Sequence, residues 1–247
     1  MTHLRLPKGQ GNWAIFLDID GTLLEIAEHP DLVNPTPRLI ELLARLYDVI
    51  GGAIALISGR PIADIDKLFG PLQVPVAGLH GLERRDAAGK LHRYNFNDFQ
   101  ITKIKEKLTE FARENSGIFV EDKGPAVALH FRGAPELEAR IEDHIRQLTP
   151  LLEPDFQVVS GKMVFEIKPL GSNKGTAISA FMQELPFEGR QPVFVGDDVT
   201  DEDGFEVVNR LGGHSIGVGI TTMTLAQWHL DDVSEVLIWL ESLIGNN

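Results

Sequence analysis

Residues 14–24 constrain the fold of this chain more than any other stretch. Their sequence is Ala-Ile-Phe-Leu-Asp-Ile-Asp-Gly-Thr-Leu-Leu, in which an apolar run of strand length ends at Asp18 and Asp20 and a glycine follows. Because side chains alternate between the two faces of a strand, the two carboxylates start on the same side. Converging carboxylates are costly to bury unless positive charge lies between them, so we expect a divalent cation at this strand end.

A plain turn and a calcium-binding loop are the alternative interpretations of this stretch. Asp and Gly are ordinary turn residues, so Asp-x-Asp alone also fits a plain turn after a strand. A calcium-binding loop needs an acidic or amide side chain two residues after Asp20 and then a glycine, but Thr22 and Leu23 occupy those positions. The complete Asp-x-Asp-Gly-Thr pattern after an apolar run favours a cation site over both a plain turn and a calcium-binding loop.

Composition limits the class of protein. A chain of 247 residues with 43% hydrophobic residues can build a sizeable core, and the absence of cysteine excludes disulfides and thiolate metal sites. A net charge of −13 opposes nucleic-acid binding.

Residues 1–11 lack an apolar targeting segment and no stretch reaches membrane-spanning length, so we expect a cytoplasmic protein without a membrane partner. No coiled-coil signal or obvious interface patch is present, and we expect a monomer.

Strands alternate with helices at both ends of the chain. The predicted strands cover residues 14–17, 53–57, 74–79, 192–195 and 215–218, and the predicted helices cover residues 37–49, 61–69, 174–183 and 233–243. This alternation predicts an α/β fold with a parallel sheet and helices on both faces. Ligands of such sheets bind beyond the carboxyl ends of the strands, where Asp18, Asp20, Ser58 and His80 fall.

The middle of the chain has a different pattern. Short strand-like runs and two helical segments predict a separate α+β domain over residues 84–168. The core is then built from residues 1–83 and 169–247, with the middle domain inserted into it.

Four groups of residues require a joint explanation. They are Asp18 with Asp20, Ser58 with Arg60, Lys174, and Asp197 with Asp198 and Asp201. Magnesium binds through one or two carboxylates plus substrate phosphate, and the Ser58 hydroxyl and Lys174 ammonium can hold phosphate oxygens. These are the parts that phosphoryl transfer needs, and a carboxylate can serve as its nucleophile.

Each group also has an ordinary interpretation. Ser58-Gly59 fits a plain turn, and the acidic segment 197–203 fits a solvated helix start. Lys174 fits a surface lysine, although a cation at a helix start opposes the helix dipole. The segment around Lys174 lacks the phosphate-binding P-loop spacing. The order of the groups and their placement at strand ends together favour the phosphoryl-transfer interpretation.

Asp18-Ile-Asp20-Gly-Thr, Ser58-Gly-Arg60, Lys174 and Gly196-Asp-Asp-Val-Thr-Asp201 resemble the four motifs of the haloacid dehalogenase superfamily. The segments 79–85, 161–169 and 196–202 further resemble the trehalose-6-phosphate phosphatase family. The resemblance implies a Rossmann-like core with an inserted α+β cap. It also implies Mg²⁺-dependent hydrolysis of a small-molecule sugar phosphate, trehalose 6-phosphate, to trehalose and phosphate through an aspartyl-phosphate.

The resemblance also implies residue roles. Asp18 is the nucleophile and Asp20 the general acid and base. The implied metal ligands are the carboxylates of Asp18 and Asp197 and the backbone carbonyl of Asp20. Asp201 is expected behind these ligands, and Asp198 either behind them or as an alternate ligand. Ser58 and Lys174 bind phosphate. The expected substrate-binding residues are Gly21, Ser58, Gly59, Arg60, His80, Glu121, Lys123, Arg132, Lys162, Glu166 and Lys174.

Strand alternation in the inserted domain separates polar from apolar side chains. Lys162, Glu166 and Lys168 share one face of the predicted strand 162–168, and His130 and Arg132 share one face of the strand 126–132. An antiparallel sheet with one solvated face accounts for this pattern. The family resemblance implies instead that polar groups here bind the distal glucose.

Three rival functions remain. A sister phosphatase acting on sucrose phosphate or a glyceryl-mannose phosphate would keep the core aspartates but change the polar set of the inserted domain. A non-catalytic regulator would lack Asp18 or Asp20, and both are present. A phosphotransferase or mutase would return the phosphoryl group to a sugar, which product analysis distinguishes from hydrolysis.

Overall fold

The computed structural model describes residues 6–7, 12–26, 34–70, 72–94, 98–161 and 163–245. It divides the chain into two compact units: unit 1 comprises Met1–Arg93 and Ser172–Asn247, and unit 2 comprises Tyr94–Gly171. None of the helices formed by the described residues is both long and apolar enough to cross a lipid bilayer.

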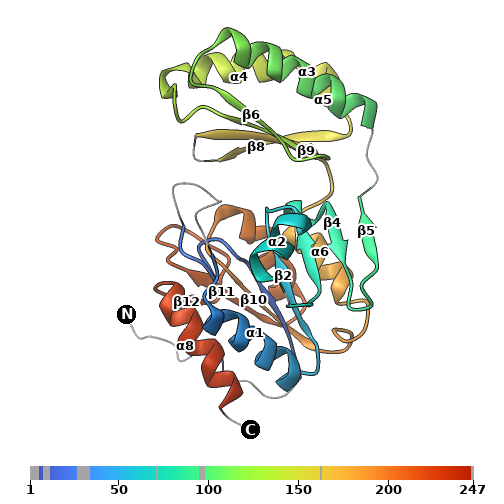
Figure 1. Ribbon diagram of the computed structural model, residues 1–247, viewed down its shortest axis with the longest axis vertical. Coiled ribbons are helices and arrows are strands. Elements are labelled where there is room, and N and C mark those ends of the chain that lie inside the picture. Colours follow the sequence, from blue (N-terminus) through green and yellow to red (C-terminus); the bar gives the residue numbers. More distant parts are fainter. Residues whose placement is uncertain are drawn as a thin grey trace. The chain divides into compact units, whose positions relative to one another are not determined.

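Unit 1 contains an eight-stranded sheet in the order β12-β11-β10-β1-β2-β3-β4-β5 (Figure 1). Its strands are β1 (Trp13–Leu17), β2 (Ile54–Ile57), β3 (Val76–Gly78), β4 (Glu83–Arg85), β5 (Leu91–Arg93), β10 (Gln191–Gly196), β11 (His214–Val218) and β12 (Trp228–Leu230). The pairs from β12 to β3 are parallel, whereas β3–β4 and β4–β5 are antiparallel. The predicted α/β fold with a mostly parallel sheet is confirmed.

Helices cover both faces of this sheet. They are α1 (Pro37–Val49), α2 (Ile62–Phe69), α6 (Lys174–Phe181), α7 (Glu202–Arg210) and α8 (Val233–Ile244). Alternate residues of β1 belong to different cores: Ile15 and Leu17 pack with the apolar sides of α1, α2 and α8, whereas Phe16 packs with α6 and α7. Because both faces are buried, the strands are continuous apolar runs.

Local sequence signals set where two of these helices begin. The hydroxyl of Thr36 accepts a hydrogen bond from the Leu39 amide at 3.2 Å, and Pro37 occupies the first helical position. Asn173 caps α6 by accepting from the Thr176 amide at 2.8 Å. The second cap fixes the position of Lys174 at the first turn of α6.

Unit 2 is a four-stranded antiparallel sheet, in the order β6-β7-β9-β8, with helices over one face (Figure 1). Its elements are α3 (Asp98–Glu114), β6 (Phe119–Asp122), β7 (Val127–His130), α4 (Glu138–Gln147), α5 (Thr149–Leu152), β8 (Phe156–Gly161) and β9 (Val164–Pro169). The core forms where alternate strand residues such as Leu129 and Ile167 meet Ile104 and Leu108 of α3. The opposite face of the sheet carries the polar side chains.

The structure divides the chain at different positions from those expected. The predicted inserted domain covers residues 84–168, whereas the contacts between residues divide the chain after Arg93 and after Gly171. The reason is the hairpin β4–β5, which extends the large sheet through backbone pairing with β3. These two strands therefore belong to unit 1.

Candidate active site

Three loops meet at the carboxyl edge of the unit 1 sheet. They follow β10, β1 and β2, which are adjacent parallel strands, so their carboxyl ends lie at the same edge. The loop after β1 stays beside β10 because the Asp18 amide donates to the Val195 carbonyl at 3.0 Å. This arrangement brings Asp18, Ser58 and Asp197 to one region.

A buried lysine bridges two aspartates at this edge. Nζ of Lys174 lies 2.7 Å from Oδ1 of Asp18 and 2.7 Å from Oδ1 of Asp201. Relative exposure is 4% for Asp18, 3% for Lys174 and 0% for Asp201. An unpaired charge would be costly at this depth, so each of these groups depends on the others.

Burial and charge shift the pKa values of these groups. Burial raises the pKa of Asp18 well above its ordinary value, and the Asp201 and Asp197 carboxylates add to this although Lys174 opposes it. Burial, with the nearby Asp201 charge, raises the pKa of Asp197 to about 6. Burial alone would lower the pKa of Lys174, but the Asp18 and Asp201 carboxylates outweigh it and raise the value.

The carboxylates at this edge fit a divalent cation. One carboxylate oxygen from each of Asp18, Asp197 and Asp201 lies within 4.8 Å of the others. Oδ1 of Asp197 is buried and has no hydrogen-bond partner in the part of the chain that the structure describes. Three carboxylates thus face one ammonium. An oxygen-rich, negatively charged site of this kind suits Mg²⁺.

Asp201 and Asp198 differ in their surroundings. Oδ2 of Asp201 accepts from the amides of Asp197 at 3.1 Å and Asp198 at 3.0 Å, while its other oxygen accepts from Lys174. Asp198 is exposed, and its Oδ1 accepts from the Val199 amide at 2.7 Å at the start of the short helix Val199–Asp201. Asp201 therefore fixes the loop and the lysine, and Asp198 caps a helix.

The expected convergence of Asp18 and Asp20 on one cation is wrong for their side chains. The Asp20 carboxylate pairs with Arg60, and Asp20 does not belong to the group of carboxylates around Asp18. Strand alternation fails here because β1 ends at Leu17 and residues 21–23 form a turn, with Gly21 at φ +85°. Asp197, not Asp20, faces Asp18 across the site.

Two glycines make the close approach of the aspartates possible. A Cβ atom on Gly21 would lie 2.0 Å from Oδ2 of Asp197, and one on Gly196 would lie 2.4 Å from Cγ of Asp201. Real Cβ atoms do not approach other atoms so closely, so a side chain at either position would displace an aspartate. Gly21, expected to bind substrate, thus leaves the room that Asp197 occupies.

Ser58, Gly59 and His80 lie together at the end of β2. The Ser58 hydroxyl is buried and accepts from the Arg60 amide at 3.1 Å, and the His80 amide donates to the Ser58 carbonyl at 2.9 Å. A Cβ on Gly59 would lie 2.6 Å from Nε2 of His80. Leu79 and His80 adopt φ +50° and +54°, conformations that cost about 1–3 kcal/mol each and cluster at functional sites.

Several of the polar residues expected in the inserted domain contact one another on unit 2. Nζ of Lys123 lies 3.0 Å from the Glu166 carboxylate, and Nε2 of His130 lies 2.9 Å from that of Glu121. The hydrogen bond from His130 lowers the pKa of Glu121. Glu121 and Glu166 both align with Ala128 in adjacent strands, so they share one face of the sheet.

The other polar residues singled out in the inserted domain are Arg132, Lys168 and Lys162. Arg132 is exposed and follows β7, and Lys168 on β9 is buried. Lys162 lies outside the described residues.

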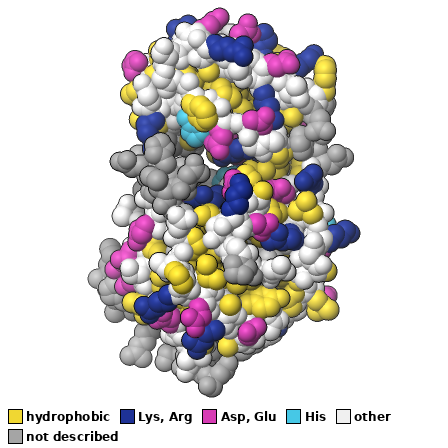
Figure 2. All heavy atoms as spheres, viewed as in Figure 1, with side chains coloured by type: hydrophobic (Ala, Val, Ile, Leu, Met, Phe, Trp, Pro, Cys, Tyr) yellow, Lys and Arg dark blue, Asp and Glu magenta, His cyan; other side chains and the backbone are white. Residues whose placement is uncertain are grey.

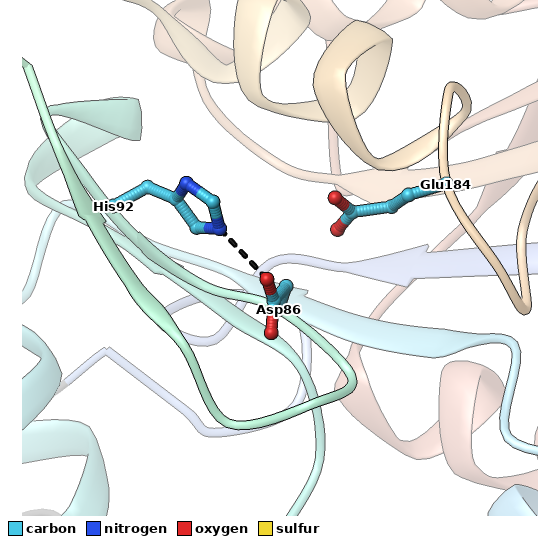
Figure 3. A group of neighbouring side chains, drawn as sticks. All are labelled: Asp86, His92 and Glu184. Atoms are coloured by element: carbon cyan, nitrogen blue, oxygen red, sulfur yellow. Dashed lines mark hydrogen bonds and ion pairs between the residues drawn. The ribbon is translucent and has the colours of Figure 1, made fainter.

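A second cluster of metal-ligand side chains lies elsewhere in unit 1 (Figure 3). It comprises Asp86, His92 and Glu184. Nε2 of His92 lies 2.7 Å from Oδ2 of Asp86, whose Oδ1 accepts from the amides of Ala88 and Lys90. Glu184 forms an ion pair with Arg84. The members of this cluster are therefore paired with nearby donors.

Sequence reasoning missed several of these contacts. The Glu83 carboxylate accepts from the Ile62 amide at 2.6 Å at the start of α2, and Asp86 pairs with His92 across the β4–β5 hairpin. Glu83 and Ile62 are 21 positions apart, and no motif links them. An Asp before a Gly-containing turn between two short strands was the available signal for the hairpin.

Acidic and basic side chains are interspersed over the surface shown in Figure 2. The concentration of carboxylates around Asp18 is thus a local feature and not part of a uniformly acidic surface. Local positive charge at the site comes from Lys174 and Arg60.

The fold places this chain among proteins of the haloacid dehalogenase type. A phosphatase of the haloalkanoate (HAD) enzyme superfamily from Bacteroides thetaiotaomicron has a similar fold, with a TM-score of 0.65 at 16% identity over 99% of each chain.

More specific matches identify the family. The trehalose-phosphatase family model matches residues 16–235. The chain is 45% identical over 237 residues to the trehalose-6-phosphate phosphatase of Escherichia coli (strain K12), covering 96% of this chain and 88% of that one. The C-terminal domain of C. albicans trehalose-6-phosphate phosphatase has a TM-score of 0.83 at 26% identity, covering 95% of this chain and 93% of that one. The chain belongs to the trehalose-phosphatase family, whose members are phosphoric monoester hydrolases.

Proposed function

We propose that this protein hydrolyses trehalose 6-phosphate to trehalose and inorganic phosphate, with Mg²⁺ as cofactor and an aspartyl-phosphate intermediate. One observation supports the proposal above the others. A buried lysine holds the Asp18 carboxylate, beside an oxygen of Asp197 that has no partner among the described residues, in a chain 45% identical to the E. coli enzyme.

In the first half-reaction the carboxylate of Asp18 is the nucleophile. One of its oxygens forms a bond to phosphorus while the bond from phosphorus to the sugar oxygen breaks. Asp20, two residues further on, donates a proton to that sugar oxygen as it leaves. General acid catalysis of this kind contributes about 10²–10⁴-fold.

In the second half-reaction water replaces the sugar. Asp20, now ionised, takes a proton from the water as its oxygen attacks phosphorus, and the bond from phosphorus to Asp18 breaks. Inorganic phosphate is released and both aspartates return to their starting states. One residue thus serves first as acid and then as base.

The other residues hold charge in place. Lys174 and the Ser58 hydroxyl bind phosphate oxygens, and Asp201 orients Lys174. The carboxylates of Asp18 and Asp197 and the backbone carbonyl of Asp20 would hold Mg²⁺. When bound, this ion neutralises the negative charge of the phosphoryl group during transfer.

Sugar recognition is assigned to the polar face of the unit 2 sheet. Glu121, Lys123 and Glu166 lie on or beside one face, and their paired charges can exchange their present partners for hydroxyl groups. A site built to bond sugar hydroxyls discriminates strongly, because a missing hydroxyl leaves polar groups unpaired.

Phosphate release from a panel of esters tests the proposal. The panel contains trehalose 6-phosphate, sucrose 6-phosphate, glucose 6-phosphate and an aryl phosphate, each with and without Mg²⁺. We expect Mg²⁺-dependent activity with clear preference for trehalose 6-phosphate. Equal rates on all four esters would overturn the sugar assignment. Inactivity on all would favour a sugar-phosphate-binding regulator, and phosphoryl transfer to a second sugar would indicate a mutase.

A matched pair of variants tests the assignment of the unit 2 face. Glu166→Gln is expected to lower kcat/KM for trehalose 6-phosphate but not for the aryl phosphate. Glu142→Gln, on the exposed side of α4, is the control and should change neither. Unchanged selectivity in the Glu166 variant would show that this face does not read the sugar.

A further inference from the structure

Arg60 and Asp20 form a bidentate ion pair in unit 1. Nε of Arg60 lies 2.7 Å from Oδ2 of Asp20, and Nη2 lies 2.6 Å from Oδ1. The side chains are 13% and 37% exposed, respectively. Two parallel bonds between a planar guanidinium and a carboxylate fix the orientation of both groups, which a single bond does not.

Hydrogen bonds at both its amide and its carbonyl hold the backbone of Arg60 in place. Its amide donates to the Ser58 hydroxyl at 3.1 Å, and its carbonyl accepts from the Leu79 amide at 3.0 Å. Gly78 packs so closely that a Cβ there would lie 2.8 Å from the Arg60 carbonyl oxygen. Asp20, in contrast, lies in the turn after β1, and its side chain is the more exposed of the two.

We infer that Arg60 is a positioning residue for the acid–base group Asp20, and not chiefly a ligand of the substrate phosphate. The well-anchored guanidinium holds the Asp20 carboxylate in one orientation near Ser58. Both Asp20 oxygens engage the edge of the guanidinium formed by Nε and Nη2. The inference rests on the proposed role of Asp20, and it differs from the expectation that Arg60 binds substrate.

Misplacement of a reacting group by about 1 Å can cost about 10²-fold in rate. We therefore expect Arg60→Ala to lower kcat/KM for trehalose 6-phosphate by about 10–10²-fold, with the loss mainly in kcat and not in KM. Arg60→Lys should not restore the rate, because an ammonium cannot hold both carboxylate oxygens in one plane.

The leaving group separates positioning from substrate binding. The 2,4-dinitrophenolate leaving group needs no proton, so kcat/KM for 2,4-dinitrophenyl phosphate should be nearly unaffected by Arg60→Ala. In an Asp20→Asn background, Arg60→Ala should cause no further loss on trehalose 6-phosphate, since residues that act through one another are not additive. The control is Arg85→Ala: Arg85 forms an equally bidentate pair with Asp66, at 2.8 and 2.7 Å, and its loss should leave both substrates unaffected.

Equal losses on both substrates, a raised KM and additivity with Asp20→Asn would overturn the inference and make Arg60 a phosphate ligand. If the wild type hydrolyses aryl phosphates but not trehalose 6-phosphate, the proposed substrate is wrong. The single and double variants of Arg60 and Asp20 are then compared on phenyl phosphate, because phenolate needs protonation more than 2,4-dinitrophenolate does. That comparison decides the role of Arg60. Inactivity of the wild type on every ester would refute the catalytic role of Asp20 and this inference with it.

Discussion

Two clusters in unit 1 contain similar side chains but have opposite electrostatics. The cluster around Asp18, with Asp197 and Asp201, is largely buried and has more carboxylates than cations. The cluster of Asp86, His92 and Glu184 is half-buried, and its members pair with each other or with Arg84. Burial raises the pKa of Asp197, whereas the hydrogen bond from His92 lowers the pKa of Asp86.

Only the Asp18 cluster has the burial and the excess of carboxylates that suit a cation, whereas the donors around Asp86 already satisfy the hairpin cluster. Ionising Asp197 is less favourable in the folded protein than in the unfolded chain, because its pKa is raised to about 6, and a nearby cation would offset that cost. Ionising Asp86 is favourable without any ligand, because the donors are already supplied by the hairpin. Residue type alone does not distinguish the clusters, but burial and unsatisfied oxygens do.

Removing the nucleophile should produce the largest difference between the clusters. Asp18→Asn is expected to lower kcat by about 10⁴-fold or more, because a nucleophile is not replaced by its neighbours. Asp86→Asn, the matched change in the hairpin cluster, should retain the wild-type kcat. Phosphate release measures both rates, and mass spectrometry after rapid acid quenching detects the phosphoenzyme. A phosphorylated Asp18→Asn protein would place the nucleophile elsewhere.

Removing the cation of each cluster should have the next largest effect, on stability. Lys174→Met leaves the buried carboxylates of Asp18 and Asp201 without their common partner, and breaking a buried pair in this way costs about 3–5 kcal/mol. Thermal unfolding in EDTA measures the loss. Arg84→Met should cost less, since its partner Glu184 is 28% exposed and can be solvated. Equal losses of stability in the two variants would mean that the burial of the Asp18 cluster does not raise the cost of removing its cation.

Much of the fold follows from local sequence. Continuous apolar runs such as β1 and β2 are typical of strands buried on both faces, and parallel pairing then brings Asp18 and Ser58 to one edge. Lys174 was an informative mismatch: a cation at the first turn of a helix opposes the dipole, and the structure shows it buried against two aspartates.

Other contacts could not be predicted because they depend on distant pairing. Strand alternation placed Asp20 with Asp18, but the turn at Gly21 redirects it to Arg60, 40 positions away. The hairpin β4–β5 is three residues per strand, too short for sequence to show that it pairs with β3. Strand β8 is half-exposed and has no regular alternation of apolar residues.

Asp197 offers a test of the electrostatics that depends on pH. Its pKa is about 6 in the folded chain against 3.8 ordinarily, so the folded state binds more protons and stability falls as pH rises between these values. In EDTA, Asp197→Asn should therefore be more stable than wild type by about 1–3 kcal/mol above pH 6 and no more stable near pH 4. Thermal unfolding across this range gives the difference. Mg²⁺ should reverse the order at neutral pH by stabilising only the wild type. A variant less stable than wild type at every pH would contradict the raised pKa.

The smallest effect is expected in the hairpin cluster and has the opposite sign. The pKa of Asp86 lies below its ordinary value of 3.8, chiefly because His92 donates to the carboxylate, so its contribution is present above that value and is lost as pH falls below it. Asp86→Asn keeps an acceptor for the turn amides but removes the charge, and should lower stability at pH 7 by about 1 kcal/mol or less, the net contribution of one side-chain hydrogen bond. His92→Gln, which can still donate to Asp86, is the control and should lose less. If Asp86→Asn stabilised the protein as Asp197→Asn is expected to, the two clusters would share one electrostatic character and burial would not be what separates them.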